Sequence, residues 1–363
     1  MIAKGELDDF RVPACLPDEG QATPPAAHMG KRGLSARTFP VKAMKNRPAV
    51  RLRSGFFTMK GRRVMRNIIC TSCPRQCKAA RSAREGRGYC RMPYGPVVAR
   101  AALHKGEEPC ISGDPDGPGG SGTVFFSGCS LSCVFCQNAP ISHDRFGKSI
   151  TPARLAEIFR ELVEQGAYNI NLVNPTHFVP AILDALALYR PPVPIVYNTS
   201  GYERVEILRQ LEGAVDIYLP DLKYADAGLS EALSGAADYP AIATDAILEM
   251  ARQTGPMRLG RTGFAVRGTM VRHLVLPGHT RDSMRVLDWM SENLPAGVFV
   301  SLMFQYTPIA AVPGHPELSR RLTPRECRKV WNYLLEKGLT DGYVQQRESA
   351  GGAFIPAFDL TGV

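Results

Sequence analysis

Two patterns of apolar residues alternate along most of the chain and predict its elements. Short, almost fully apolar runs predict six strands, at residues 123–127, 168–173, 194–197, 215–219, 269–276 and 298–305. Runs that are apolar on both faces are typical of strands in a buried parallel sheet. Between them, apolar residues recur at helical spacing and predict helices at residues 151–166, 178–189, 203–211, 241–253, 283–293 and 324–337.

The regular change from strand to helix favours right-handed βαβ units, and therefore an α/β fold with a parallel sheet. We expect a barrel or partial barrel, although periodicity alone also fits an open, doubly wound sheet. In such barrels, functional residues gather at the carboxyl ends of the strands. A further short strand is expected at Val97–Leu103, and the Gly-, Pro- and Asp-rich run Gly113–Gly122 is expected to be a loop.

Composition divides the chain into four parts. Residues 1–66 are rich in Pro, Ala and Arg without periodicity, and we predict that they form a disordered leader. Residues 67–112 hold a cysteine-rich module and a lead-in strand, residues 113–340 the barrel, and residues 341–363 a C-terminal tail. A true start of translation at Met59 or Met65 explains the leader equally well.

The net charge of +10 is concentrated in the leader, which carries 14 Lys and Arg against 5 Asp and Glu, whereas the remainder carries 30 against 29. A basic leader is compatible with RNA or an acidic partner, but the nearly neutral remainder does not favour a nucleic-acid function.

No apolar run reaches the roughly 18 residues of a membrane span. An export signal is also missing, because Asp8, Asp9 and Arg11 interrupt the N-terminus, so we expect a cytoplasmic protein.

Seven of the ten cysteines lie in two tight groups, which favours metal binding over disulfides in a chain without an export signal. The first group, called the cysteine triad, has the spacing Cys129-x3-Cys133-x2-Cys136. A structural zinc site takes four ligands, and His143 is the nearest fourth candidate. A cubic iron–sulfur cluster normally takes four cysteines. Three thiolates would leave one iron open to bind something else, and that iron is where chemistry is expected.

The second group, called the N-terminal cysteine group, consists of Cys70, Cys73, Cys77 and Cys90. Four thiolates at these spacings can close a tetrahedral site. Zinc and an auxiliary iron–sulfur cluster fit the ligand count equally well, and we expect the site to be structural. The other cysteines, Cys15, Cys110 and Cys327, are expected to be single thiols.

Polar residues follow several of the predicted strands and are candidates for ligand contacts. They are Asn174 and Thr176 after the second strand, Ser200 after the third, Asp221 and Lys223 after the fourth, His273 within the fifth, and Gln305 and Tyr306 at the end of the sixth. Lys223 can neutralise a carboxylate as a point charge. Because neighbouring residues of a strand point to opposite faces, at most one of Arg272 and His273 should face the barrel interior. Gln305 and Tyr306 are our candidates for residues that face a substrate.

The triad spacing, with Phe135 just before the third cysteine, resembles the radical S-adenosylmethionine (radical SAM) superfamily. Residues from Cys70 to about 334 resemble its branch of pyruvate formate-lyase activating enzyme-like proteins of the X type. The blocks that carry this resemblance are the N-terminal cysteine group, 107–113, 125–129, 133–138, 171–177 and 272–278. The resemblance implies a partial (β/α)6 barrel, a 4Fe–4S cluster, SAM as cofactor, and a flavodoxin- or ferredoxin-type electron donor.

The resemblance also implies roles for individual residues. The turn at Ser200 is similar to a Thr-Asn-Gly-type turn that contacts SAM in activating enzymes, and Asp221 and Lys223 match their Asp-x-Lys pair. His273 lies in a run similar to one that passes near the adenosine. Phe135, next to the third cysteine, is a further candidate for cofactor binding. Asn174 and Thr176 occupy the place of a Gly-Gly-Glu-Pro-type turn that binds the cofactor's amino group, but the glycines are absent here.

Three functions therefore remain as hypotheses. The first is a radical SAM enzyme that abstracts hydrogen from an unknown protein or small-molecule substrate. The second is an activase that installs a glycyl radical on a partner enzyme, which the departure at Asn174 puts in doubt. The third belongs to another class: a metal-stabilised protein that binds nucleic acid through the basic leader.

Overall fold

The computed structural model describes residues 68–82, 85–309, 312–345 and 356–363. The predicted leader, residues 1–66, and the alternative start sites lie outside the described residues. Among the described residues, no helix combines the length and the apolar character needed to cross a membrane.

Ten strands of the described part form one sheet, with the order β12-β11-β10-β8-β7-β6-β4-β3-β5 and with β9 beside β10. Seven strands run parallel to one another: β4 (Gly120–Phe126), β6 (Ala167–Val173), β7 (Ile195–Thr199), β8 (Ile217–Pro220), β10 (Ala265–Leu274), β11 (Phe299–Met303) and β12 (Gly342–Gln345). The antiparallel additions are β3 (Val97–His104), β5 (Lys148–Ser149) and β9 (Arg258–Leu259). The end strands β12 and β5 are not paired with each other, so the sheet stays open, as a partial barrel requires.

Six strand–helix units make up the main body and confirm the predicted alternation. The helices that follow β4, β6, β7, β8, β10 and β11 are α3 (Pro152–Glu164), α4 (Val179–Leu188), α5 (Val205–Leu208), α7 (Tyr239–Thr254), α8 (Thr280–Asn293) and α9 (Pro324–Glu336). The helix starts follow their sequence signals. Thr151 Oγ1 accepts from the backbone N–H of Arg154 at 3.1 Å, which satisfies one of the free donors at the start of α3.

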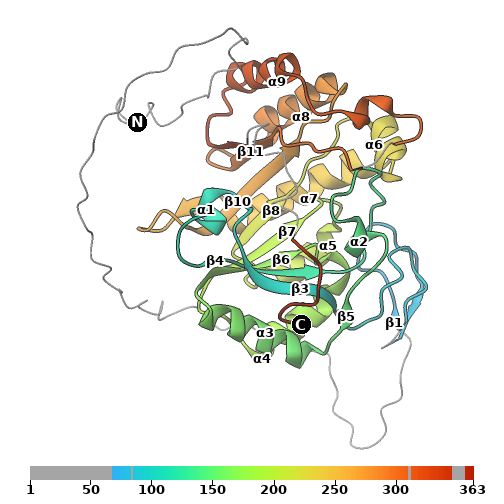
Figure 1. Cartoon of the computed structure of the whole chain (residues 1–363), viewed down its shortest axis with the longest axis vertical. Coiled ribbons are helices and arrows are strands. Elements are labelled where there is room, and N and C mark those ends of the chain that lie inside the picture. Colours follow the sequence, from blue (N-terminus) through green and yellow to red (C-terminus); the bar gives the residue numbers. More distant parts are fainter. Residues whose placement is uncertain (1–67, 83–84, 310–311, 346–355) are drawn as a thin grey trace, which may run out of the picture. The chain divides into compact units, whose positions relative to one another are not determined.

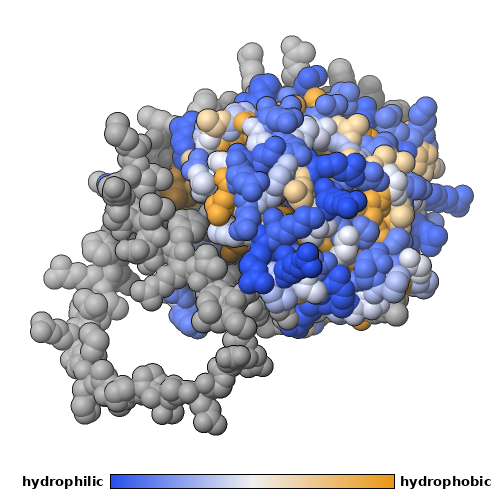
Figure 2. Space-filling model, turned by 90° about the horizontal axis from the view of Figure 1, so that it is seen from above, coloured by the Kyte–Doolittle hydropathy of each residue, from blue (hydrophilic) through white to orange (hydrophobic). Residues whose placement is uncertain are grey.

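The long helices cover one face of the sheet, and shorter segments cover the other. Leu155 and Phe159 of α3 pack against Val124 and Leu172 of the sheet, while residues of α8 and α9 pack against Val271 and its neighbours. The opposite face, called the inner face, is covered by α1 (Pro109–Ser112) and, at β3 and β4, by Phe358 of the C-terminal segment. Seen from above, the described surface is mostly hydrophilic with small hydrophobic groups, as expected where amphipathic helices turn their polar sides outward (Figure 2).

Three segments differ from the sequence-based expectation. The run Gly113–Gly122 was expected to be a loop, but β4 begins at Gly120. Glycine can pair there because the strands approach closely: a Cβ on Gly122 would lie 2.8 Å from the Cβ of Ala167. The helix expected at 203–211 is reduced to α5 and a 3₁₀ turn, because Glu203 is buried in hydrogen bonds instead of starting a helix. Part of the C-terminal tail forms β12 and adds a seventh parallel strand.

The cysteine-rich module is built on a two-stranded sheet of β1 (Ile68–Ile69) and β2 (Ala80–Arg81). It contacts the loop that carries the cysteine triad. The Arg75 side chain donates to the carbonyl of Ser130 at 2.8 Å, and the Tyr89 hydroxyl donates to Ser132 Oγ at 2.8 Å. These contacts place the module against the carboxyl end of β4.

Candidate functional site

The cysteine triad lies on the loop between β4 and α2 (Ala139–Ser142), where a parallel sheet gathers its functional residues. Each sulfur has a polar neighbour from a different element. The contacts are Asn174 Nδ2 to Cys129 Sγ at 3.1 Å, Ser234 Oγ to Cys133 Sγ at 2.9 Å, and Ser142 Oγ beside Cys136 Sγ at 3.1 Å. The three side chains are therefore held by the turn after β6, by α6 (Ala227–Ser234) and by α2.

Electrostatics at the triad favour a bound cation. Burial and, to a lesser extent, the neighbouring Cys133 raise the pKa of the Cys129 thiol to about 12. Burial also raises the pKa of Cys133, although the ammonium of Lys223 acts in the opposite direction. Three thiolates at this place would need more positive charge than Lys223 provides, and a bound metal would supply it.

The donor set of the triad fits an iron–sulfur cluster. Within the described ranges, no three His, Cys, Asp or Glu side chains converge as ligands of one metal ion would. The cysteines of a cubane each bind a different iron, so a cluster does not require such convergence. Cys70, Cys73 and Cys90 are buried and Cys77 is exposed, and the metal expected at this N-terminal cysteine group stays a prediction.

A cavity of about 560 Å³ lies between the module and the cysteine triad. Its lining includes Cys90 of the N-terminal cysteine group and Cys129 of the triad, together with the basic residues Arg87, Arg91 and Arg145. The two cysteine groups therefore border one basic cavity, which sequence spacing alone did not indicate.

Asn174 and Thr176 of the turn after β6 belong to one hydrogen-bonded group that ends on the triad. The Thr176 hydroxyl donates to Glu203 Oε1 at 2.5 Å, and the Thr199 hydroxyl donates to the same oxygen at 2.5 Å. Thr176 Oγ1 also lies 3.2 Å from Asn174 Oδ1, whose amide nitrogen contacts Cys129. Glu203 thus ties the ends of β6 and β7 together and holds the residue that touches the triad.

Glu203 was not among the candidates from sequence, because an acidic residue at the start of an expected helix usually serves the helix dipole. It is almost fully buried, and its Oε2 has no partner among the described residues. Burial raises the pKa of Glu203 to about 7, although hydrogen bonds from Thr176 and Thr199 lower it. The folded protein therefore keeps this carboxyl protonated at pH values where an unfolded chain would not.

Replacing Glu203 by Gln is expected to flatten the dependence of stability on pH. In the native protein the group titrates near pH 7, and in the unfolded chain near 4.5, so its stabilising contribution is complete below pH 4.5 and is lost as the pH rises to about 7. The lost free energy of unfolding is about 3 kcal/mol. Apparent melting temperatures of anaerobic protein between pH 5 and pH 8 measure it. The control is Glu206→Gln, which removes an exposed carboxylate. If the melting temperature of Glu203→Gln depended on pH as strongly as that of the wild type, the raised pKa of Glu203 would be contradicted.

Asp221 and Lys223 follow β8 and form an ion pair, with Lys223 Nζ 2.5 Å from Asp221 Oδ2. Burial opposes the charge of Lys223, but Asp221 and the nearby Cys133 raise its pKa well above the ordinary value. The ammonium is thus charged and close to the triad. The turn with Ser200 lies beside it: Gly201 has φ +80°, and a Cβ there would lie 2.2 Å from the carbonyl oxygen of Asp221, so only glycine fits without a shift.

The other candidates point in different directions. Arg272 faces the inner face, whereas His273 faces away from it and donates through Nδ1 to the carbonyl of Leu222 at 2.7 Å. Burial lowers the pKa of His273 to about 4, so the ring is neutral. Gln305 contacts inner-face residues, but the hydroxyl of Tyr306 donates to the carbonyl of Leu318 at 2.7 Å.

Phe135 is buried, and its ring lies 6.2 Å from that of Tyr306, centroid to centroid. The structure therefore brings Asn174 and Lys223 to the triad, with Thr176 behind Asn174 and Asp221 behind Lys223. It does not bring the side chains of His273 and Tyr306 to the inner face. The cofactor roles expected for Phe135, Ser200 and His273 stay predictions.

Comparisons with known proteins agree with the triad. The family model of the radical SAM superfamily matches residues 123–290. An uncharacterized protein of Methanocaldococcus jannaschii is 31% identical over 281 residues, which cover 74% of this chain and 75% of that protein.

Two solved structures are among those found by the structural comparison. A radical SAM methyltransferase from Sphaerobacter thermophilus is 17% identical, with a TM-score of 0.44, 64% of this chain covered and 67% of that chain. SuiB from Streptococcus suis, bound to S-adenosylmethionine, is 14% identical, with a TM-score of 0.41 and 63% of this chain covered. This chain spans 48% of the SuiB chain.

Proposed function

Because the chain belongs to the radical SAM superfamily, we propose that it is an enzyme that cleaves SAM reductively and abstracts hydrogen from a substrate bound at the inner face. The observation that carries the proposal is the cysteine triad at the carboxyl end of β4, with Asn174 and Lys223 beside it. Membership of the superfamily implies a 4Fe–4S cluster and SAM. When bound, they supply a 5′-deoxyadenosyl radical as the hydrogen-abstracting group.

The chain's own residues hold the cofactors and set their surroundings. Cys129, Cys133 and Cys136 would hold the cluster, and Asn174 Nδ2 would donate a hydrogen bond to the Cys129 sulfur, which stabilises negative charge there. Lys223 presents a buried positive charge that can pair with the carboxylate of SAM. The N-terminal module contacts the triad loop through Arg75 and Tyr89 and so helps to hold that loop in place. An electron donor of flavodoxin or ferredoxin type would supply the electron.

The activase hypothesis and the nucleic-acid hypothesis have less support than the general proposal. The activase hypothesis requires a partner enzyme with a glycyl radical, and none of the described contacts selects such a partner. The nucleic-acid hypothesis depends on the leader, which lies outside the described residues. Both therefore stand behind the general proposal of a radical SAM enzyme.

Anaerobic reconstitution tests the proposal. Protein loaded with iron and sulfide and reduced with dithionite is expected to release 5′-deoxyadenosine and methionine from SAM, and its reduced cluster should change its electron paramagnetic resonance signal when SAM is added. Metal analysis should give the four irons of one cubane plus the metal of the N-terminal cysteine group. Protein that holds zinc at the triad and leaves SAM intact would overturn the proposal.

A further inference from the structure

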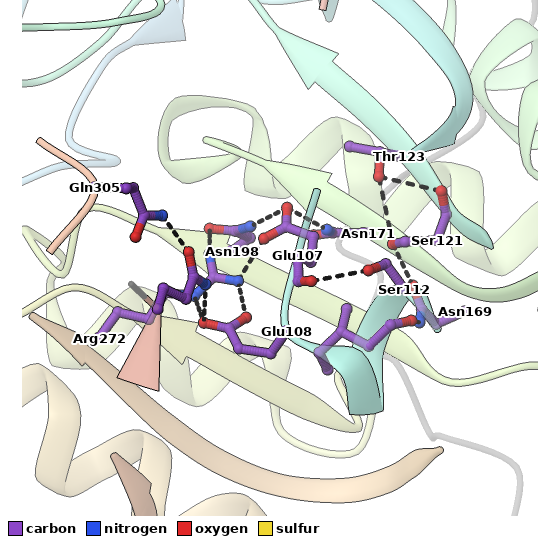
Figure 3. A network of polar contacts seen from close by, with 12 residues as sticks. Glu107, Glu108, Ser112, Ser121, Thr123, Asn169, Asn171, Asn198, Arg272 and Gln305 are labelled. Carbon is purple, nitrogen blue, oxygen red and sulfur yellow. Dashed lines mark hydrogen bonds and ion pairs between the residues drawn. The ribbon is translucent and has the colours of Figure 1, made fainter. Parts of the chain in front are cut away.

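The inner face carries a group of polar side chains that the cysteine chemistry does not use. It lies near the carboxyl ends of the strands, between the sheet and the segment before α1 (Figure 3). We call it the inner-face cluster; its members are Glu107, Glu108, Asn171, Asn198, Arg272, Gln305 and Gln345. A backbone bridge between Asp221 and Arg272 joins the cluster to the ion pair beside the triad.

Negative charge exceeds positive charge in this cluster. Glu108 is fully buried and receives two hydrogen bonds from the Arg272 guanidinium, one of them from Nε at 2.9 Å. Glu107 shares the same guanidinium through Nη2. Two carboxylates therefore face one guanidinium, which gives a formal charge of −1. Burial lowers the pKa of the nearby His104, so its ring adds no charge near pH 7.

The side-chain amides of Asn171 and Asn198 have their orientations set by the charged groups. Both donate through Nδ2 to Glu107 Oε1 at 3.1 Å, and Asn198 Oδ1 accepts from Arg272 at 3.3 Å. A flipped Asn171 would turn its oxygen toward a carboxylate. Its Oδ1 is therefore an acceptor, and it is buried without a partner among the described residues.

A carboxylate also sets the orientations of the side-chain amides of Gln345 and Gln305. Gln345 Nε2 lies 3.4 Å from Glu108 Oε1, so Gln345 Oε1 is left to accept from Gln305 Nε2. The remaining atom, Gln305 Oε1, is a second buried oxygen without a partner in the described part of the chain. Both free atoms of the cluster are thus hydrogen-bond acceptors, and unmet acceptors of this kind are costly unless a ligand satisfies them.

We propose that the inner-face cluster binds a positively charged, hydrogen-donating group of the substrate, either an alkylammonium or an alkylguanidinium. This inference rests on the proposed function, because it takes the inner face as the substrate side. Such a ligand supplies the missing positive charge and N–H donors for the free oxygens. Glu107, Asn198 and Gln305 are partly exposed, so a ligand can reach the cluster.

The test measures binding of small probes to the anaerobic, cluster-loaded protein by calorimetry. Three of the four probes carry a butyl chain, n-butylammonium, n-butylguanidinium and 1-butanol, and the fourth, butyrate, is a carboxylate with four carbons in total. At least one of the two cations is expected to bind. The cation that binds more tightly shows whether the cluster recognises an alkylammonium or an alkylguanidinium group. Butanol and butyrate are expected to bind at least tenfold more weakly, because a hydrogen bond to a charged group contributes the equivalent of a tenfold or larger change.

Two substitutions should move the binding in opposite directions. Glu107→Gln removes the excess charge and should weaken cation binding about tenfold or more, whereas Gln305→Glu adds a charge and should strengthen it several-fold. Glu157→Gln removes an exposed carboxylate on α3 and should leave binding unchanged. General damage to the fold would weaken binding in both cluster variants, so the opposite signs separate recognition from folding.

Three results would overturn the inference: preferred binding of butyrate, equal binding of butanol and the cations, or no saturable cation binding. Release of 5′-deoxyadenosine is measured on the same preparations. Protein that cleaves SAM but shows no preference for cations would disprove only this inference. Protein that fails to cleave SAM would count against the proposed function instead.

Discussion

Replacing Cys133 by Ala is expected to abolish the release of 5′-deoxyadenosine from SAM. Cys133 is the buried middle residue of the triad, and its sulfur accepts from Ser234 Oγ, so its replacement leaves two of the three sulfurs of the triad. Two thiolates cannot hold a cubane that normally takes four cysteines. Iron and sulfide content should fall, and the product should drop to the level of protein without iron, measured by chromatography after anaerobic reduction.

Two other cysteine substitutions serve as comparisons. Cys327→Ala changes a thiol on α9 outside both groups and should leave iron content and SAM cleavage unchanged. Cys70→Ala should remove metal from the N-terminal cysteine group alone. Full activity in Cys133→Ala, with unchanged iron, would show that the triad does not hold the catalytic cluster.

Replacing Arg272 by Met is expected to lower the free energy of unfolding by about 3–5 kcal/mol, the usual cost of leaving buried charge without its partner. The guanidinium is 8% exposed and serves both Glu107 and Glu108, and Glu108 is not exposed at all. After the substitution two carboxylates would face each other at the inner face. Thermal unfolding of the anaerobic protein, followed by circular dichroism, measures the loss.

Arg252 offers a matched control, because it also contacts two carboxylates, Glu212 and Glu249. Its side chain is 53% exposed, so water and salt screen these ion pairs. Arg252→Met should therefore change the melting temperature far less than Arg272→Met. Equal effects of the two substitutions would mean that the inner-face cluster is open to solvent and that its charges are not buried.

Periodicity predicted the main body well because its elements are long and strongly patterned. The helix with Leu155 and Phe159 begins where Thr151 and Pro152 indicate, and the parallel strands β4 and β6 are largely buried on both faces. The cysteine triad could be identified as a candidate site from the sequence, since three cysteines in eight residues form a local signal.

The sequence could not indicate contacts that join distant segments. Glu108 and Arg272 are 164 positions apart, and only the folded sheet brings them together. Glu203 looks like an ordinary acidic residue at a helix start until Thr176 and Thr199 converge on it. Gln345 lies in a part that composition presented as a tail, and its strand became visible only through its pairing with β11.

The position of β12 has a practical consequence for handling the protein. Shortening the chain at residue 341 would uncover the backbone of β11 along Val300–Met303, and a bare parallel strand invites pairing with another molecule. The same truncation would remove the Gln345 carboxamide, which sets the orientation of the Gln305 side chain. A truncated variant would therefore tend to aggregate, and an expressed form of the protein should keep every residue through Gln345.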